Sequence, residues 1–191
     1  TQIWSTSFYT AKYIKGRWKR NSLVVYPGCN IPINSELSQK KEKLFLSVGR
    51  FFETGHCKKQ FEIVKAFQIW KSQDPHTTKE WKLILAGGIQ DRNYYEQVVN
   101  EVKSSDIEIV PNVDLDALIN LYERASFLVH ATGLGEDPRV NPERMEHFGI
   151  TIIEGMSRGC IPILFKYGGP DEIAGKELGY RFNSERHLIE R

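Results

Sequence analysis

The chain has 191 residues, of which 40% are hydrophobic and 12% aromatic, enough for one full α/β domain with some additional structure but not for two. Its 26 Lys and Arg residues nearly balance 24 Asp and Glu residues, which argues against nucleic acid as a partner, because such proteins carry a basic excess. The odd cysteine count argues against a disulfide framework and favours a reduced, cytoplasmic setting. An apolar run of the roughly 20 residues that span a bilayer is also absent from the sequence.

Residues 1–42 differ in character from the rest of the chain. Apolar residues between Phe8 and Trp18 are spaced for one face of a helix, and the apolar run 22–26 predicts a short strand. The polar, turn-rich stretch that begins with Pro27 is typical of a linker. We therefore divide the chain into residues 1–42 and a domain that covers 43–191.

From Leu44 onward, short apolar runs alternate with longer segments of helical period. Apolar runs without polar alternation are typical of strands covered on both faces, so the alternation predicts an α/β fold with a Rossmann-like, doubly wound parallel sheet. Ligands of such sheets bind beyond the carboxyl ends of the strands. The predicted strands are 44–48, 82–86, 107–110, 127–130 and 161–165, and the predicted helices are 58–70, 94–103, 115–125 and 149–159.

The loop after the first predicted strand has the composition of an anion site. Gly49 and Arg50 end the strand, and Lys58 opens the following helix, whose N-terminus carries a partial positive charge. Two cations beside these amides suit a diphosphate. The alternative is that Arg50 caps a neighbouring strand and Lys58 is a solvated helix start. The glycine patterns of dinucleotide-binding and P-loop enzymes are absent from the sequence.

The stretch from Glu146 to Glu154 places two carboxylates around a Phe-Gly pair at a predicted turn into a helix. Backbone amides at 148–151 are expected to point into the cleft. Glu154 lies on a face that can reach a ribose, and Glu146 can face a sugar. The alternative is that both are ordinary acids near a helix start, where the helix dipole favours them.

The spacing of these two glutamates, with Phe-Gly between them, is similar to the signature of the family-4 retaining glycosyltransferases (glycosyl transferase group 1). The similarity extends from about Leu44 to Phe182 and includes S-V-G-R…K-K-Q, L-I-L-A-G-G and G-C-I-P-I-L-F-K-Y-G-G-P-D-E-I. The resemblance implies the C-terminal, donor-binding domain of the GT-B fold. It implies catalytic roles for Glu146, Arg50 and Lys58, and donor contacts for Gly49, Asn112, Val113, His147, Phe148, Gly149, Ile150, Thr151 and Glu154.

Within that assignment, the resemblance gives each group a partner. Glu146 would contact the donor sugar, Glu154 the nucleotide ribose, and Arg50 and Lys58 the pyrophosphate. Backbone at 148–151 would meet sugar hydroxyls and phosphate, and the base would sit near Asn112 and Val113.

Two departures affect the expected shape of the sugar pocket. His130-Ala131 stand where the family often has Pro-Ser, and the segment 133–145 is longer than the usual linker to the first glutamate. Two weaker motifs also have alternatives. Asp114 belongs to a D-x-D sequence that we interpret as a helix cap rather than a metal site. Asp171-Glu172 after the Gly-Gly-Pro sequence could contact the donor or turn into a helix.

The resemblance implies a hexosyltransferase that uses a nucleotide-diphosphate sugar, needs no metal or other cofactor, and retains the anomeric configuration. The acceptor, a glycan or a lipid-linked glycan, would bind a separate N-terminal domain, of which residues 1–42 resemble only the last helix and the interdomain linker. We expect this chain to bind donor but to transfer little by itself. A cytoplasmic location, with the full-length protein at the inner face of a membrane, is compatible with this function.

Three alternative functions are compatible with the same fold. A non-catalytic nucleotide-sugar-binding module of the same fold would bind the donor without turnover. A sugar epimerase or a phosphorylase of the same shape would act on its substrate differently, and a structural protein of this fold would bind no nucleotide.

Overall fold

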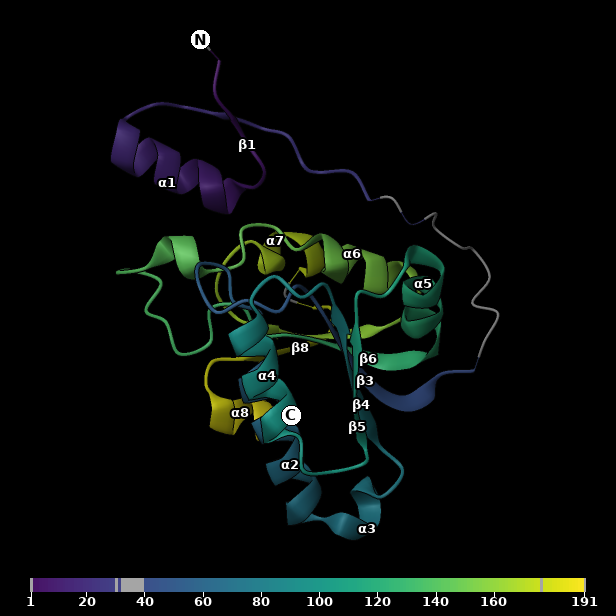
Figure 1. Cartoon of the computed structure of the whole chain (residues 1–191). Coiled ribbons are helices and arrows are strands. Elements are labelled where there is room, and N and C mark those ends of the chain that lie inside the picture. The colour runs from purple at the N-terminus through teal and green to yellow at the C-terminus, as the bar shows by residue number, and fades with distance from the viewer. Residues whose placement is uncertain (1, 30, 32–39, 176, 191) are drawn as a thin grey trace.

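The computed structural model describes residues 2–29, 31, 40–175 and 177–190 (Figure 1). Its main feature is a six-stranded sheet in which all pairs of neighbouring strands are parallel, in the order β5-β4-β3-β6-β7-β8. The strands are β3 (Glu42–Val48), β4 (Lys82–Gly87), β5 (Ile107–Pro111), β6 (Ala125–His130), β7 (Ile161–Phe165) and β8 (Tyr180–Phe182). A separate parallel pair is formed by β1 (Trp4–Ser5) and β2 (Leu23–Val24).

The strand order contains one change of direction. The chain moves outward from β3 through β4 to β5 and then returns to place β6 on the other side of β3. The carboxyl ends of β3 and β6 therefore lie side by side, and the helices that follow these two strands lie on opposite faces of the sheet. Doubly wound sheets bind their ligands at this kind of switch point.

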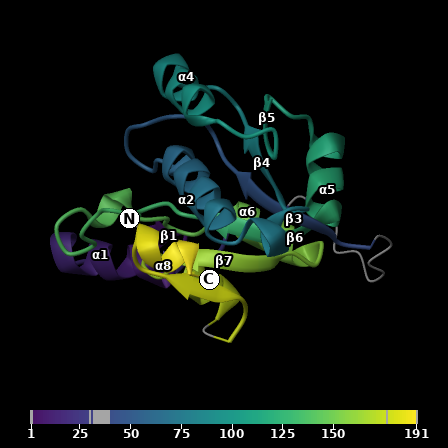
Figure 2. The same cartoon turned by 90° about the horizontal axis from the view of Figure 1, so that it is seen from below.

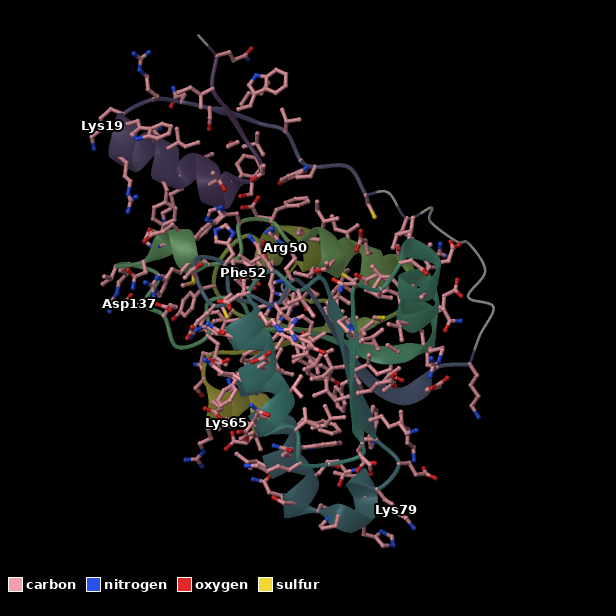
Figure 3. All side chains as sticks on the ribbon, viewed as in Figure 1. Lys19, Arg50, Phe52, Lys65, Lys79 and Asp137 are labelled. Carbon is pink, nitrogen blue, oxygen red and sulfur yellow. The ribbon has the colours of Figure 1, made fainter. Side chains whose placement is uncertain are left out.

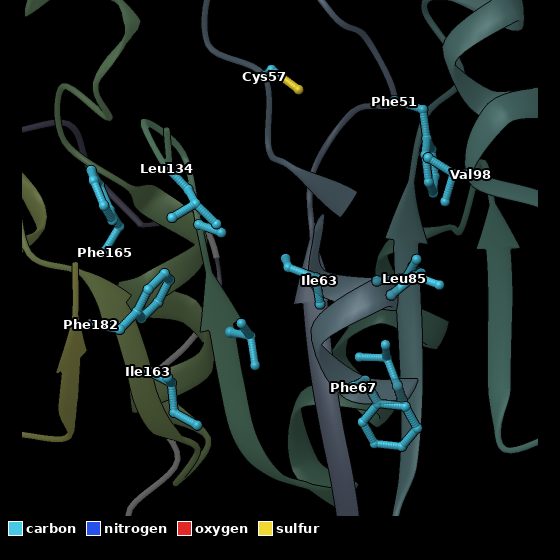
Figure 4. Packing of buried hydrophobic residues seen from close by; sticks show 14 of the residues in the cluster. Phe51, Cys57, Ile63, Phe67, Leu85, Val98, Leu134, Ile163, Phe165 and Phe182 are labelled. Carbon is cyan, nitrogen blue, oxygen red and sulfur yellow. The ribbon is translucent and has the colours of Figure 1, made fainter. Parts of the chain in front are cut away.

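Helices cover both faces of the sheet because consecutive residues of each strand point to opposite sides. In β4, Leu83 and Leu85 belong to one hydrophobic cluster, whereas Ile84 and Ala86 belong to the other. Figure 4 shows the first cluster, and Figure 2 shows α2 and α5 on opposite sides of the strands. The first face carries α2 (Gln60–Gln73), α4 (Arg92–Glu101) and α8 (Glu185–Ile189), and the second carries α5 (Leu115–Arg124), α6 (Ile150–Ser157) and α7 (Pro170–Ala174).

Helix α1 (Phe8–Trp18) lies across the edge at which the carboxyl ends of the strands meet (Figure 1). It begins after Ser7, whose side chain accepts a hydrogen bond from Thr10 N. Glu172, just inside α7, accepts two further bonds from this helix start, from Phe8 N at 2.8 Å and Tyr9 N at 2.5 Å. The first segment of the chain is thus docked on the loop that follows β7.

The structure confirms the predicted sheet class, all five strands predicted from Leu44 onward and the short strand predicted within 22–26. Among the elements that it adds are β1, β8 and the short helix α3 (Pro75–Thr78). The helix after β3 begins at Gln60 and not at Lys58, because Lys59 adopts a left-handed conformation with φ of 59°. Asp114 caps α5 by accepting a bond from Ala117 N at 2.8 Å, which confirms the helix-cap interpretation. Most of the predicted linker, residues 30 and 32–39, lies outside the described residues.

All three cysteines are free thiols, in agreement with the prediction against a disulfide framework. Within the described ranges, no helix has the length and hydropathy needed to cross a bilayer.

Candidate functional site

The loop after β3 is held in place by a buried glutamine. Gln60, which is 1% exposed, donates hydrogen bonds from Nε2 to the carbonyl oxygens of Gly49 at 3.2 Å and Arg50 at 3.1 Å. On its other side the loop touches β4, where a Cβ atom on Gly87 would lie 2.1 Å from the Gly49 carbonyl oxygen. Gln60 was not among the predicted site residues, since a single glutamine at the start of a helix carries no signal of this contact.

Lys58 and Glu146 meet at the switch point between β3 and β6. The Lys58 Nζ atom lies 2.5 Å from Glu146 Oε2, and both side chains are largely buried. A Cβ atom on Gly49 would lie 2.5 Å from Lys58 Cγ. The lysine side chain can therefore pass Gly49 to reach the carboxylate only because this position has no side chain. Two residues that the sequence placed in one site are therefore in direct contact.

Both oxygens of the Glu146 carboxylate have close neighbours. Oε1 accepts hydrogen bonds from the backbone N–H groups of His147 at 3.1 Å and Phe148 at 3.4 Å. Oε2 faces Lys58 and lies 3.0 Å from Nε2 of His130, at the end of β6. Glu146 itself is 8% exposed, so the carboxylate is enclosed by these neighbours rather than open to solvent.

The electrostatics of this cluster favour a charged carboxylate and a neutral imidazole. Burial raises the pKa of Glu146, but His130 and then Lys58 outweigh burial and hold the pKa well below its ordinary range. Burial lowers the pKa of His130 and outweighs the opposite effect of Glu146. Burial and then the charge of His56 lower the pKa of His147. The site thus carries one buried anion with one ammonium as its counter-ion.

Two glycines seat the Glu146 segment against the loop after β7. Gly169 N donates to Glu146 O at 2.8 Å. A Cβ atom on Gly168 would lie 2.4 Å from the same Glu146 oxygen, and one on Gly169 would lie 2.1 Å from His147 O. The Gly-Gly sequence is needed for this backbone-to-backbone contact. Of the two interpretations of the following Asp171-Glu172, the structure shows the turn into helix α7, with Glu172 contacting α1.

Gly149 begins helix α6 in a left-handed conformation, with φ of 102°, which glycine adopts at little cost. Ile150 and Thr151 form the first turn, where backbone N–H groups have no partner within the helix. Glu154 follows one turn later on the helix, and its Oε2 accepts a hydrogen bond from the hydroxyl of the fully buried Tyr122 at 2.9 Å. The second glutamate of the motif is thereby fixed at the edge of the second hydrophobic cluster.

The other predicted residues lie at the same edge of the sheet in different contacts. Arg50 is exposed, with its guanidinium 5.1 Å from the centroid of the Phe52 ring (Figure 3). Asn112 Oδ1 accepts from Ile89 N at 3.2 Å, so this side chain joins the loops after β4 and β5, and Val113 beside it is half-buried. His147 packs its ring 4.3 Å from that of His56.

Among the described residues, no group of three or more His, Cys, Asp or Glu side chains is placed to hold a metal ion. The groups that the structure brings together are instead a cation, a buried carboxylate and free helix amides, which suit an anionic ligand that carries hydroxyl groups.

Curated relatives match most of this chain. It is 31% identical over 176 residues to the GDP-Man:Man(3)GlcNAc(2)-PP-Dol alpha-1,2-mannosyltransferase of Xenopus tropicalis, covering 88% of this chain and 34% of that protein. The mouse protein of the same name is 29% identical over 175 residues, covering 86% and 34%. The chain thus spans about a third of the length of these relatives.

Solved structures confirm the fold. A UDP-forming trehalose-phosphate synthase from Burkholderia xenovorans matches with a TM-score of 0.60 and 13% identity, covering 81% of this chain and 36% of that one. The trehalose-6-phosphate synthase OtsA matches with a TM-score of 0.61 and 11% identity, covering 85% and 38%. The sequence profile described as glycosyl transferases group 1 matches residues 32–187, which is most of the chain. The resemblance drawn from the motifs is therefore confirmed, and the chain belongs to the group 1 glycosyl transferases.

Proposed function

We propose that this chain binds a nucleotide-diphosphate sugar, with GDP-mannose as the donor, and forms the donor half of a retaining mannosyltransferase. The observation that carries the proposal is the contact between Lys58 and Glu146 at the β3/β6 switch point. The contact brings together a cation that can bind a diphosphate and a carboxylate that can bind a sugar, at the position where doubly wound sheets bind their ligands.

The chemistry of transfer fits the groups at this edge. Departure of the nucleoside diphosphate develops negative charge, which Lys58, Arg50 and the amides at the start of α6 would stabilise without a metal. A preorganised donor of this kind lowers the barrier by about 3 kcal/mol. Retention of configuration would follow from attack on the same face that the diphosphate leaves, with the leaving phosphate taking the acceptor proton.

The choice of GDP-mannose and of the acceptor rests on the relatives. Their names describe transfer of mannose from GDP-Man to a dolichol-linked oligosaccharide. The corresponding acceptor for this protein would be a lipid-linked glycan, held by the part of the full-length enzyme that corresponds to the remaining two thirds of the relatives. Such an acceptor would bring the cytoplasmic enzyme to a membrane surface.

The proposal is tested by thermal unfolding and titration calorimetry with GDP-mannose, UDP-glucose and ADP-glucose. A ligand that binds only the folded state raises its stability by about 2.7 kcal/mol at one hundred times its Kd. We expect GDP-mannose to raise the melting temperature more than the other two nucleotide sugars. If none of the three shifts the melting temperature or releases heat, the proposed function is wrong. If UDP-glucose binds most tightly, donor binding stands and the choice of mannose falls.

A second measurement separates an enzyme from a non-catalytic binding module. The full-length protein would be incubated with GDP-mannose and a lipid-linked oligosaccharide. Release of GDP that requires the acceptor supports transfer, whereas tight binding without release supports the module.

A further inference from the structure

His130 stands where the resemblance expects a proline, and the structure gives this departure a place in the site. The residue ends β6, is 4% exposed, and lies with Nε2 3.0 Å from Glu146 Oε2. The same oxygen atom is the one that Lys58 contacts at 2.5 Å. One side chain from the end of β6 and one from the loop before α2 therefore converge on one carboxylate oxygen.

The approach of His130 is within hydrogen-bonding distance, but its geometry is not that of a well-aligned hydrogen bond. Among the described residues, neither ring nitrogen of His130 has a hydrogen-bond partner of acceptable geometry, although both are buried. Buried imidazole nitrogens almost always have partners, so an orphaned pair beside a carboxylate points to a contact that forms in another state of the site. Burial also lowers the pKa of His130, and the neutral ring keeps one N–H to donate.

Lys58 is the residue whose position must change between those states. In the structure the Lys58 ammonium forms an ion pair with Glu146, whereas in the proposed function it binds the diphosphate of the donor. If Lys58 turned away with nothing in its place, Oε2 would lose its counter-ion inside a largely buried site. An unpaired buried carboxylate is strongly unfavourable.

We propose that His130 is a positioning residue that takes over the hydrogen bond to Glu146 Oε2 when Lys58 turns to the donor diphosphate. This inference rests on the proposed function. The neutral imidazole keeps the carboxylate aimed at the sugar, and the ammonium carries its charge to the diphosphate. A proline at position 130 has no side-chain donor and could not make this exchange.

The charged and titratable groups around Glu146 determine how the exchange depends on pH. Lys58 faces it from the loop before α2 and His130 from the end of β6. His147 is its chain neighbour, with His56 packed behind that ring. The loop after β7 contributes backbone only, through Gly169 N. Removing the imidazole therefore leaves Lys58 as the remaining side-chain partner of the carboxylate among these groups.

The test is titration calorimetry with GDP-mannose, whose diphosphate has no ionisation between roughly pH 5 and 8, in contrast to a terminal phosphate. We expect His130→Leu to weaken binding about tenfold at neutral pH, since Lys58 can no longer leave Glu146 at low cost. His130→Gln, whose amide can donate, is expected to bind within about threefold of the unmodified chain. His76→Leu, an exposed site on α3, serves as the matched control.

Measuring the affinity for GDP-mannose at several pH values distinguishes a positioning role of His130 from a general loss of structure in His130→Leu. In His130→Leu the pKa of Glu146 is expected to rise, so acid protonates the carboxylate, frees Lys58 and restores part of the affinity at about pH 5. In the unmodified chain Glu146 stays ionised, and the affinity is expected to remain flat over the same range. Carbon-13 NMR of the Glu146 carboxyl would report its pKa without any ligand.

Each outcome bears on one claim. If the unmodified chain binds neither GDP-mannose nor the other two nucleotide sugars, the proposed function fails, and an unchanged Glu146 pKa in His130→Leu would overturn the His130 inference separately. If the unmodified chain binds and His130→Leu matches it at every pH, the inference alone is overturned. If His130→Leu does not fold, the proton NMR resonance of the His130 Nε2–H group in the unmodified chain tests the inference instead. A downfield shift on adding GDP-mannose supports the exchange, and an unchanged resonance refutes it.

Discussion

Gly169 lies so close to His147 that a Cβ atom on the glycine would sit 2.1 Å from the His147 carbonyl oxygen. The φ angle of Gly169 is −74°, which any residue adopts, so the glycine is required for space and not for conformation. The contact sets the Glu146 segment against the loop after β7, backbone on backbone.

Gly169→Ala should therefore displace the Glu146 segment. We expect the free energy of unfolding to fall by about 1 to 3 kcal/mol, the usual cost of overpacking, and GDP-mannose binding to weaken as well. Urea denaturation and calorimetry measure the two effects. Gly16→Ala in α1 is the matched control, since its added Cβ would meet nothing within 4 Å. Equal stability of the two variants would contradict the packing argument.

Arg50 and Lys58 should contribute to donor binding with different effects on stability. Arg50→Ala removes an exposed cation, so we expect GDP-mannose to bind at least about tenfold more weakly with little change in unfolding free energy. Lys58→Ala should weaken binding similarly and also destabilise the chain, because it removes the counter-ion of a buried carboxylate. Lys79→Ala, at the opposite end of the molecule (Figure 3), is the control for a general charge effect. Unchanged affinity in Arg50→Ala and Lys58→Ala would remove the proposed diphosphate site.

Tyr122 should influence how the ribose is recognised without touching it. Tyr122→Phe removes the hydroxyl that donates to Glu154 at 2.9 Å, at an expected cost of about 1.5 kcal/mol in unfolding free energy. A less firmly held Glu154 should discriminate less between ribose and deoxyribose. We expect the ratio of the affinities for GDP and 2′-deoxy-GDP to fall toward one. A ratio that stays at the value of the unmodified chain would place the ribose elsewhere.

Acid should destabilise the chain in two stages. The pKa of His130 in the folded state is below its ordinary 6.5, so protonation of the unfolded chain lowers stability as the pH falls below that value. The pKa of Glu146 is below its ordinary 4.5, so its contribution is present above that pH and is lost as the pH falls toward the folded pKa. Urea denaturation at several pH values should show His130→Gln reducing the first stage and Glu146→Gln the second. A first stage of equal size in His130→Gln would assign it to other histidines, such as His147.

The sequence predicted the sheet well because each of its five longer strands is mainly apolar, as is typical of buried parallel strands. It missed β8, whose three residues include the polar Arg181. The predicted start of α2 is two residues too early, because the residue types at Lys58 and Lys59 do not indicate the left-handed conformation of Lys59. Helix periodicity carries little information about such boundaries.

The candidate site was predicted as a set of residues but not as a set of contacts. Motif spacing brought Lys58 and Glu146 to one edge of the sheet, and the structure places them in contact. The same spacing gave no information about Gln60, Tyr122 or His130, since these partners come from other segments and their roles depend on burial. His130 was noted only as a departure from the family pattern.

The contact between Glu172 and the start of α1 has a consequence for how the protein is made. Helix α1 has 11 residues, none of which is fully buried, and isolated helices of this length are marginal in water. The carboxylate that accepts from Phe8 N lies 164 positions further along the chain. During synthesis, which runs from the N-terminus, α1 must therefore leave the ribosome long before its partner does. The contacts between Glu172 and α1 can therefore form only after the Gly-Gly-Pro loop has been synthesised.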